Sequence, residues 1–427
     1  MLDVINSIMW AVATSLILIY GLYFSKKLTF PQFKISKIIK SLKNNNKKGI
    51  SPIKTLFLTL AGRIGVGSIA GVALAIYIGG PGTIFWMWII ALISGSLAYT
   101  ETLLSIKYKT KDKKENFGGP SFYIKKGLNK PSLALIYSLI VITAYLLGFI
   151  PIQSNTIVKS ININEPETKI ILGLVLAIIT FIIIKGGINK IANVTNKLVP
   201  FMTIIYISLA IIVIISNLEK FPQVLALIIK SAFDIKPFFT GFLTSLIIGV
   251  QRGIFSNESG IGLGGIAASS SNSNNGCQSG YIQVLGIYIT TILICTATAF
   301  MILIFDYQSI NLNNPNGIEI TSLAFNHHFG NLGNIILSLC IILFSFTTIL
   351  TGFYYCQSSL KFIFNTTYQT ILNIVVPLSV FIGTITSPTT IWNLIDILVA
   401  ILAIINIYSL YKLRQETFDY HKKYDRI

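Results

Sequence analysis

The chain has 427 residues, of which 53% are hydrophobic and only 11% are charged, and its mean hydropathy is +0.72. A soluble domain carries about a quarter charged residues, so this composition excludes one and predicts an integral membrane protein. The formal net charge is +18, but the lysines are confined to short segments between apolar runs and are not interleaved with aromatic residues. This pattern favours contact with a membrane face over nucleic-acid binding.

Apolar runs long enough to cross a bilayer recur along the whole chain, because about 20 helical residues span its roughly 30 Å hydrocarbon core. The first run, 4–24, follows an aspartate, precedes two lysines and lacks a small-residue cleavage site, so we expect a retained helix rather than a secretory signal. The segment 221–232 predicts a short interfacial helix. We predict about eleven spans: 4–24, 54–79, 83–107, 132–158, 169–186, 197–217, 240–268, 281–305, 331–363, 368–386 and 390–411.

The basic residues predict how these spans are oriented. Segment 25–54 holds nine lysines and no acid, segment 107–130 holds eight lysines, and the tail after 411 holds five more basic residues. The positive-inside rule places these segments in the cytoplasm, which puts the amino terminus outside and the carboxyl terminus inside. We therefore expect a multi-pass protein of the plasma (inner) membrane.

The orientation divides the chain into two similar halves. Residues 54–217 and 240–411 each hold five spans, and the two sets run in opposite directions, as in an inverted repeat. The helix at 4–24 stands outside this repeat. Residues 1–427 are thus expected to form a single transmembrane transporter domain.

Two of the spans are interrupted by glycine-rich sequence, at 61–71 and at 255–265. Unpaired backbone groups are costly in hydrocarbon, so such a break is expected only where the freed groups face protein, water, ions or a substrate. Two breaks in antiparallel helices predict a substrate site at the middle of the membrane in a secondary transporter.

The half-helix ends at these breaks suit a small zwitterion together with a cation. Backbone amides near Gly67 and Gly260 face the middle of the membrane and favour a carboxylate. Carbonyl groups at 61–64 and 255–256 suit sodium or an ammonium group. Glycine at 65, 67, 260, 262 and 264 would let a ligand approach the backbone closely, although close helix packing is the alternative for any single glycine.

Three ionisable residues, Arg63, Arg252 and Glu258, lie in or just before the breaks. An unpaired charge inside the membrane costs at least about 2.5 to 3.5 kcal/mol. We therefore expect a structural ion pair between Glu258 and an arginine, with binding of a substrate ammonium group or a proton as the alternative. Glu101 and Asp396 are expected to be paired or near an interface, outside the site.

Around the breaks and along nearly its whole length, the sequence resembles the alanine or glycine:cation symporter family, also called the sodium:alanine symporters. The resemblance is carried by Gly62 to Ile76, Gly79-Gly80-Pro81-Gly82-Thr83-Ile84-Phe85-Trp86, Gly118-Gly119-Pro120, Gln153-Ser154-Asn155, Lys185-Gly186-Gly187-Ile188, and Arg252-Gly253-Ile254-Phe255-Ser256-Asn257-Glu258-Ser259-Gly260. It implies a leucine-transporter-like fold that couples sodium influx to uptake of alanine, glycine or similar small neutral amino acids by alternating access.

The resemblance also implies a binding site, residue by residue. The substrate-binding residues would be Gly65, Val66, Gly67, Ser68, Gln153, Asn257, Ser259 and Gly260. The co-transported sodium ion, the only metal expected, would bind the carbonyl groups of Ala61 and Ile64 and the hydroxyls of Thr347 and Thr348. The chain departs from the family pattern at Ser68, Leu263, Gly265 and Gly352, where asparagine, serine, proline and tryptophan are usual. The glycine at 352 could enlarge the substrate pocket.

Other functions fit the sequence less well. A channel needs a continuous polar lining, whereas the polar residues here cluster at one depth. An enzyme needs a nucleophile and base or a metal set, and the Walker A, HExxH and GxSxG patterns are missing from the sequence. The serious rival is a proton-coupled amino-acid transporter of the same fold, because Ser68 lacks an amide ligand and Glu258 could carry a proton.

Overall fold

The computed structural model describes residues 2–43, 50–112, 115–162, 165–234, 240–305, 316–386 and 388–425. Five of the basic residues used to predict the orientation lie outside these ranges: Lys47, Lys48, Lys113, Lys114 and Arg426.

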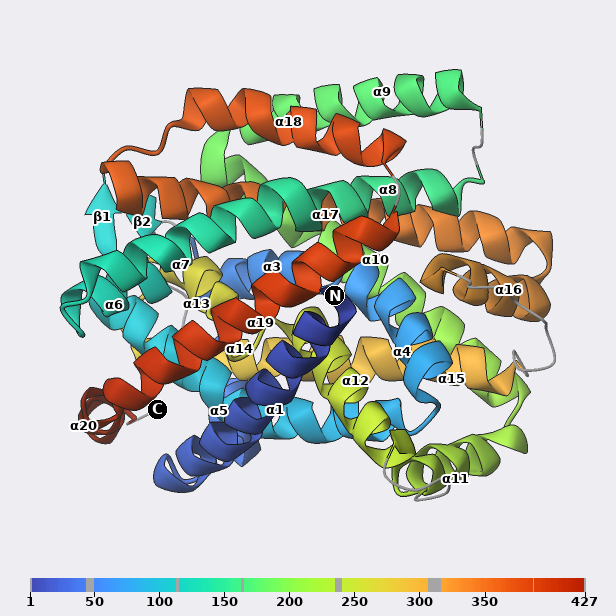
Figure 1. Ribbon diagram of the computed structural model, residues 1–427, viewed down its shortest axis with the longest axis horizontal. Coiled ribbons are helices and arrows are strands. Elements are labelled where there is room, and N and C mark those ends of the chain that lie inside the picture. The colour runs from blue at the N-terminus through green and yellow to red at the C-terminus, as the bar shows by residue number, and fades with distance from the viewer. Residues whose placement is uncertain are drawn as a thin grey trace.

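The described chain is helical except for one short antiparallel hairpin, formed by β1 (Thr110–Asp112) and β2 (Glu115–Phe117) (Figure 1). The helices up to the middle of the chain are α1 (Leu2–Lys27), η1 (Pro31–Phe33), α2 (Ile35–Leu42), α3 (Pro52–Arg63), η2 (Gly67–Gly71), α4 (Val72–Gly79), α5 (Thr83–Tyr108), α6 (Pro120–Lys126), α7 (Pro131–Ala144), η3 (Tyr145–Phe149), α8 (Ile150–Ser160), α9 (Pro166–Ile184), α10 (Gly187–Ser216) and α11 (Lys220–Ala232). They are followed by α12 (Thr240–Asn257), α13 (Leu263–Ser269), α14 (Gly276–Ile287), η4 (Tyr288–Cys295), α15 (Thr296–Ile304), α16 (Gly317–Phe329), α17 (Asn331–Phe364), α18 (Gln369–Ile385), α19 (Pro388–Lys412) and α20 (Arg414–Tyr424).

Helices long and apolar enough to cross a membrane dominate this list. Within the described residues there are eight, or nine when the bent pair α3 and η2–α4 counts as one span. The shorter apolar helix α18 and the interrupted pair α12 and α13 lie where further spans are predicted. A membrane fold built almost entirely of helices is therefore confirmed, while the total of eleven spans stays a prediction. The expected short helix after the first half is present as α11.

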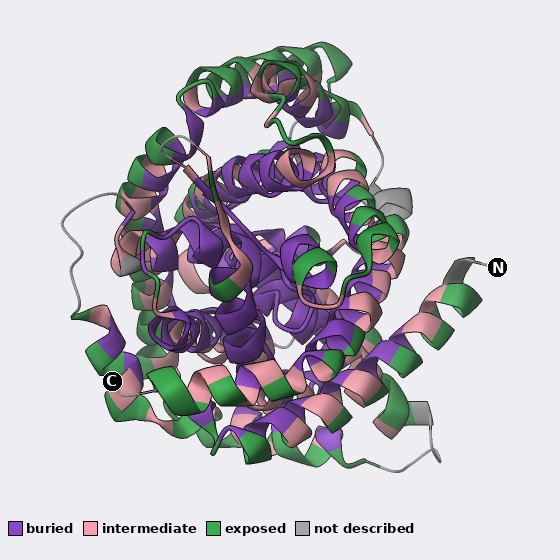
Figure 2. Cartoon of the chain, turned by 90° about the vertical axis from the view of Figure 1, so that its left-hand side faces the viewer, coloured by how far each residue is buried: buried purple, intermediate pink, exposed green. Residues whose placement is uncertain are grey.

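The arrangement of apolar and polar residues is that of a protein solvated by lipid. Large apolar side chains on α9 and α10 are exposed, for example Ile171 at 62% and Ile204 at 65%. Polar and charged side chains are buried in the centre, where Figure 2 shows the buried segments gathered. Because lipid satisfies exposed apolar groups but not polar ones, the buried polar residues mark the interior as the place to look for a site.

Helices in matching positions of the two halves pack against each other. The third helix of each half forms one such pair, α8 with α17, and α9 packs along α18 in the same way (Figure 1). The second helices, α5 and α14, form another extensive contact. A two-fold axis relating two inverted five-helix units would produce these pairings. We therefore retain the division into 54–217 and 240–411 as a proposal.

The last helix, α20, lies at the end of the molecule that also carries α6 and the hairpin (Figure 1). Lys37 and Tyr281 contact the carboxylate of Asp425 at 2.9 and 2.8 Å. Burial alone would raise the pKa of Asp425, but the hydrogen bonds from these two residues and the nearby charges of His421 and Lys34 together hold the pKa below its ordinary value. The carboxylate therefore stays ionised at neutral pH and ties α20 to α2 and α14.

Candidate functional site

The first predicted break is present between α3 and α4. The α3 helix begins at Pro52, where the side chain of Ser51 accepts the amide hydrogen bond of Lys54, and it ends at Arg63. Ile64 leaves the helical conformation, with φ −86° and ψ 87°. The chain resumes in the wide π-helical turn η2, and the two halves meet at an angle of 57°. The interruption lies in a fully buried segment, so its backbone groups face protein rather than lipid.

The second break separates α12 from α13. Glu258, Gly260 and Gly262 all have positive φ angles, of 54°, 78° and 90°. Glycine adopts such angles without cost, whereas a glutamate there is strained and needs surrounding contacts to hold it. Those contacts come from two tyrosine hydroxyls, because Tyr145 donates to Oε1 of Glu258 at 2.9 Å and Tyr355 donates to Oε2 at 3.0 Å.

The two breaks touch one another. The hydroxyls of Ser68 and Ser256 lie 2.9 Å apart, although the residues are 188 positions apart in the sequence. A side chain at Gly67 would begin only 2.7 Å from the ring of Phe255, so this glycine is required for close packing of the first break against α12. The two interrupted helices therefore touch each other at their breaks.

Gln153 of α8 binds the backbone of the first break. Its Oε1 atom accepts a hydrogen bond from the backbone amide of Val66 at 3.2 Å. A side chain at Gly65 would begin 3.1 Å from the side-chain amide of Gln153. An oxygen acceptor thus already occupies the position where the Val66 N–H could meet a carboxylate. Of the predicted substrate residues, Gly65, Val66, Gly67, Ser68 and Gln153 are brought together.

The predicted residues of the second break form a small network of their own. Asn257 Oδ1 accepts hydrogen bonds from the backbone amide and the hydroxyl of Ser259, at 3.0 and 2.5 Å. Asn257 Nδ2 is buried and has no hydrogen-bond partner among the described residues, so it is a donor available to a ligand. Gly260 instead faces α19, because its carbonyl oxygen accepts a hydrogen bond from Asn406 at 2.9 Å.

The predicted sodium ligands are brought together in part. Thr348 Oγ1 donates to the carbonyl oxygen of Ala61 at 2.9 Å, which joins α17 to the end of α3. Thr347 Oγ1 donates to the Phe344 carbonyl oxygen of its own helix, and Ile64 donates its amide to Leu60. All four predicted ligands are buried.

The expected salt bridge between Glu258 and an arginine is not formed within the described residues, although the charge of Arg63 still acts on Glu258. Arg252 forms a bidentate pair with Asp396 of α19, with N–O distances of 3.1 and 2.9 Å. Arg63 donates to the backbone carbonyl of Gln283 at 3.0 Å, and no described residue forms a salt bridge with Glu258. The reason is that α12 ends just before Glu258, so its carboxylate turns towards the tyrosines of η3 and α17 while Arg252 stays alongside α19.

Glu101 belongs to the second break, where the sequence did not lead us to expect it. Its Oε2 atom accepts hydrogen bonds from the backbone amide of Gly262 and from Asn406, each at 3.0 Å. Tyr137 also supports the break, because its hydroxyl donates to the carbonyl oxygen of Ile261 at 2.5 Å. A lone glutamate near the end of an apolar helix was the available signal for Glu101, whereas buried tyrosines give no signal in such a sequence.

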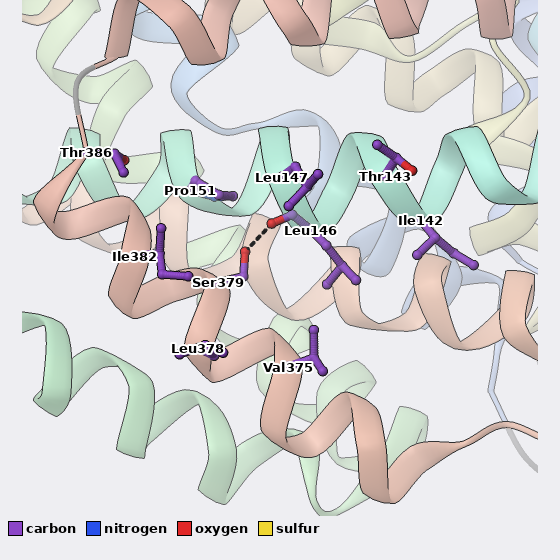
Figure 3. Close-up of a pocket in the computed structure, with 10 residues that line it drawn as sticks. All are labelled: Ile142, Thr143, Leu146, Leu147, Pro151, Val375, Leu378, Ser379, Ile382 and Thr386. Carbon is purple, nitrogen blue, oxygen red and sulfur yellow. Dashed lines mark hydrogen bonds between the residues drawn. The ribbon is translucent and has the colours of Figure 1, made fainter.

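A groove of about 420 Å³ between η3–α8 and α18 is separate from the two breaks (Figure 3). Its lining is apolar, and one of its few polar groups is satisfied because Ser379 donates to the Leu146 carbonyl oxygen at 2.5 Å. Leu147 and Leu378 of this groove are 60% and 52% exposed, so it opens to the lipid-facing surface rather than to the site.

Comparison with known proteins identifies the family. The model of the sodium:alanine symporter family matches residues 1–427. The amino-acid carrier protein AlsT of Bacillus subtilis is 32% identical, with 99% of this chain and 91% of that protein covered. The probable sodium/glutamine symporter GlnT of the same organism is 34% identical, with 99% and 89% covered. The sodium/alanine symporter AgcS of Methanococcus maripaludis is 30% identical, with 96% and 93% covered. The resemblance seen in the motifs is thereby confirmed, and the chain belongs to the sodium:alanine symporter family, whose members are multi-pass membrane transporters and not enzymes.

Proposed function

We propose that this protein couples sodium influx to the uptake of small neutral amino acids such as alanine and glycine. The observation that carries the proposal is the meeting of the two breaks, which places a backbone amide, a free amide donor and a hydroxyl–carbonyl pair in one buried region. The names of the relatives support sodium and an amino acid as the transported pair.

The substrate carboxylate would bind the donors of both breaks. The Val66 amide already points at an oxygen, and Asn257 Nδ2 lacks a partner in the described structure. A carboxylate that accepts a hydrogen bond from Asn257 Nδ2 would gain about 1.5 to 3 kcal/mol in place of a buried unsatisfied donor, whereas at the Val66 amide it would replace the oxygen of Gln153. Sodium would bind beside it, between the Ala61 carbonyl oxygen and the Thr348 hydroxyl.

A small substrate is favoured by the surroundings of Gly352. A side chain at this position would begin 2.6 Å from the ring of Tyr145, so the space left by the missing tryptophan is filled by the tyrosine rather than added to a pocket. The Tyr145 ring in turn stacks on Phe149, with centroids 4.8 Å apart. Alanine and glycine therefore fit the proposal better than glutamine, which the name of one relative suggests.

Transport would follow alternating access. Sodium and the amino acid would bind from outside in the inner (plasma) membrane, with the amino terminus outside and the carboxyl terminus in the cytoplasm. The bundle containing the interrupted helices would then rock, and both ligands would leave inward. One sodium ion driven by 100 mV and a tenfold gradient supports an accumulation of roughly 500-fold.

The test is uptake of labelled alanine into proteoliposomes that contain the purified protein. We expect uptake to require an inward sodium gradient and to be inhibited by unlabelled glycine but not by glutamine. Uptake that needs no sodium would contradict the coupling. Uptake driven by an inward proton gradient in sodium-free buffer would instead favour the proton-coupled alternative, and liposomes without protein provide the background.

A further inference from the structure

Three buried polar atoms without hydrogen-bond partners converge on Gly264, at the start of α13. They are Nη2 of Arg63, Oε1 of Gln283 and Oε1 of Glu101, which lie 2.5, 3.2 and 3.5 Å from the point where a side chain at Gly264 would begin. They come from three elements, α3, α14 and α5, and their side chains are at most 2% exposed. Buried polar groups are nearly always paired, so this convergence marks a place where something binds.

The charges around this point do not balance. Arg63 interacts electrostatically with two carboxyl groups, those of Glu258 and Glu101. Arg252 is paired with Asp396 through both of its terminal nitrogens and does not contribute. With both glutamates ionised, the cluster Arg63, Glu101 and Glu258 therefore carries one excess negative charge in the interior of the membrane, where an unbalanced charge is costly.

The other titratable groups that face Glu101 do not correct this imbalance. They are the hydroxyls of Tyr123 on α6, Tyr137 on α7 and Tyr355 on α17. A phenol has an ordinary pKa near 10 and is neutral at pH 7. One further positive charge is needed.

The hydrogen bonds show where a proton would reside. Tyrosine hydroxyls donate to both oxygens of Glu258, and Oε2 of Glu101 accepts from Gly262 and Asn406. Oε1 of Glu101 is the remaining carboxylate oxygen of the cluster, and it has no donor among the described residues.

A second acceptor without a donor faces the same point. Thr59 accepts a hydrogen bond from Nε2 of Gln283 at 2.9 Å, which fixes the amide so that Oε1 of Gln283 is the free atom. A proton on Oε1 of Glu101 would convert one of these two acceptors into a donor to the other and satisfy both.

Each of two other occupants fails on a separate ground, sodium on its ligands and water on the charge. A sodium ion at this point would meet two oxygens and would lie against the guanidinium of Arg63, whereas hard cations prefer six or more oxygen ligands. A buried water could accept from Arg63 and donate to Glu101 and Gln283, but it would leave the excess charge in place.

We propose that Glu101 is a proton-binding residue that carries a proton on Oε1, hydrogen-bonded to Gln283, whenever no other cation balances the charge of Arg63, Glu101 and Glu258. The identity of that other cation, sodium bound near Ala61, rests on the proposed function. The proton site itself does not.

Infrared difference spectroscopy of the purified full-length protein in lipid nanodiscs tests this proposal. The pH is varied in sodium-free buffer, and the C=O stretching band of a protonated buried carboxylic acid is followed. We expect a band in the wild type that is lost at high pH, is missing in Glu101→Gln and is unchanged in the exposed control Glu319→Gln. Glu258→Gln should lower the pH at which the band disappears, because it removes the excess charge.

A second variant keeps Glu101 and so does not depend on how well Glu101→Gln folds. Gln283→Met removes the acceptor, and the band should then move to higher frequency. A band that persists in Glu101→Gln would overturn the proposal. So would a wild-type protein without a titrating acid band, which is the result expected if the site holds only a buried water. Adding sodium should lower the intensity of the wild-type band. A band whose intensity does not change with sodium would contradict the assignment of sodium as the other cation, but it would not contradict the proton on Glu101.

Discussion

Thr348 is the side chain that most directly links the first break to the rest of the protein. Its hydroxyl donates to the carbonyl oxygens of Ala61 and Phe344, at 2.9 and 3.0 Å. Without an ion, this hydroxyl satisfies a carbonyl that would otherwise be orphaned at the end of α3. With an ion bound, the Thr348 hydroxyl oxygen and the Ala61 carbonyl oxygen would both coordinate the cation. This change requires no large movement of α3 or α17.

We predict that Thr348→Ala raises the sodium concentration needed for half-maximal uptake by roughly tenfold, because a hydrogen bond or ligand contact to a charged group is worth about 1.5 to 3 kcal/mol. Sodium titrations of alanine uptake in proteoliposomes measure this. Thr348→Ser keeps the hydroxyl and should behave nearly like the wild type. Thr290→Ala is the matched control, because the Thr290 hydroxyl bonds to Gly286 of its own helix segment. Equal sodium dependence in Thr348→Ala and Thr290→Ala would remove Thr348 from the sodium site.

Sequence reasoning located the breaks but not the partners of their charges. The runs of glycine and polar residues at 61–71 and 255–265 are local signals, since a helix in lipid cannot be interrupted without local sequence that permits it. The pairing of Arg252 with Asp396 joins positions 144 residues apart, and it depends on how α12 lies against α19. The same holds for Glu101, whose carboxylate reaches Gly262 across 161 positions. Such contacts are set by tertiary packing, which a single sequence does not specify.

The interrupted helix α12 is held to α19 by this ion pair and by its aromatic neighbours. The guanidinium of Arg252 lies 4.9 Å from the ring centre of Trp392, and Trp10 of α1 donates to the backbone carbonyl of Asp396 at 3.0 Å. The extra helix α1 therefore braces α19 at the same level as the ion pair. In an alternating-access cycle this contact would have to loosen whenever α12 moves relative to α19.

We predict that Asp396→Asn destabilises the protein, because breaking a buried pair leaves an uncompensated charge and costs about 3 to 5 kcal/mol. The double variant Arg252→Met with Asp396→Leu should recover much of the loss, since both charges are then gone. Thermal unfolding of the purified variants measures this, with the exposed Asp419→Asn as the control. A thermal midpoint for Asp396→Asn equal to that of Asp419→Asn would show that the pair does not hold the two helices together.

Helices in equivalent positions of the two proposed halves pack against each other. The pairs α5 with α14 and α8 with α17 pack against the interrupted helices, whereas α9 and α18 pack together against α8 and α17 at the edge of the molecule (Figure 1). The exposed apolar residues lie on the outer helices, and the buried polar residues lie between the pairs. The proposed inverted repeat would explain why two glycine-rich interruptions, nearly 190 residues apart in the sequence, touch at Ser68 and Ser256.

The most direct test is an experimental structure of the protein in nanodiscs with saturating sodium and alanine. We predict density for the amino acid where the two breaks meet, with its carboxylate on the Val66 amide and the Asn257 side chain, and density for an ion between Ala61 and Thr348. Density for alanine at another place in the protein, with both breaks free of ligand, would contradict the proposed site.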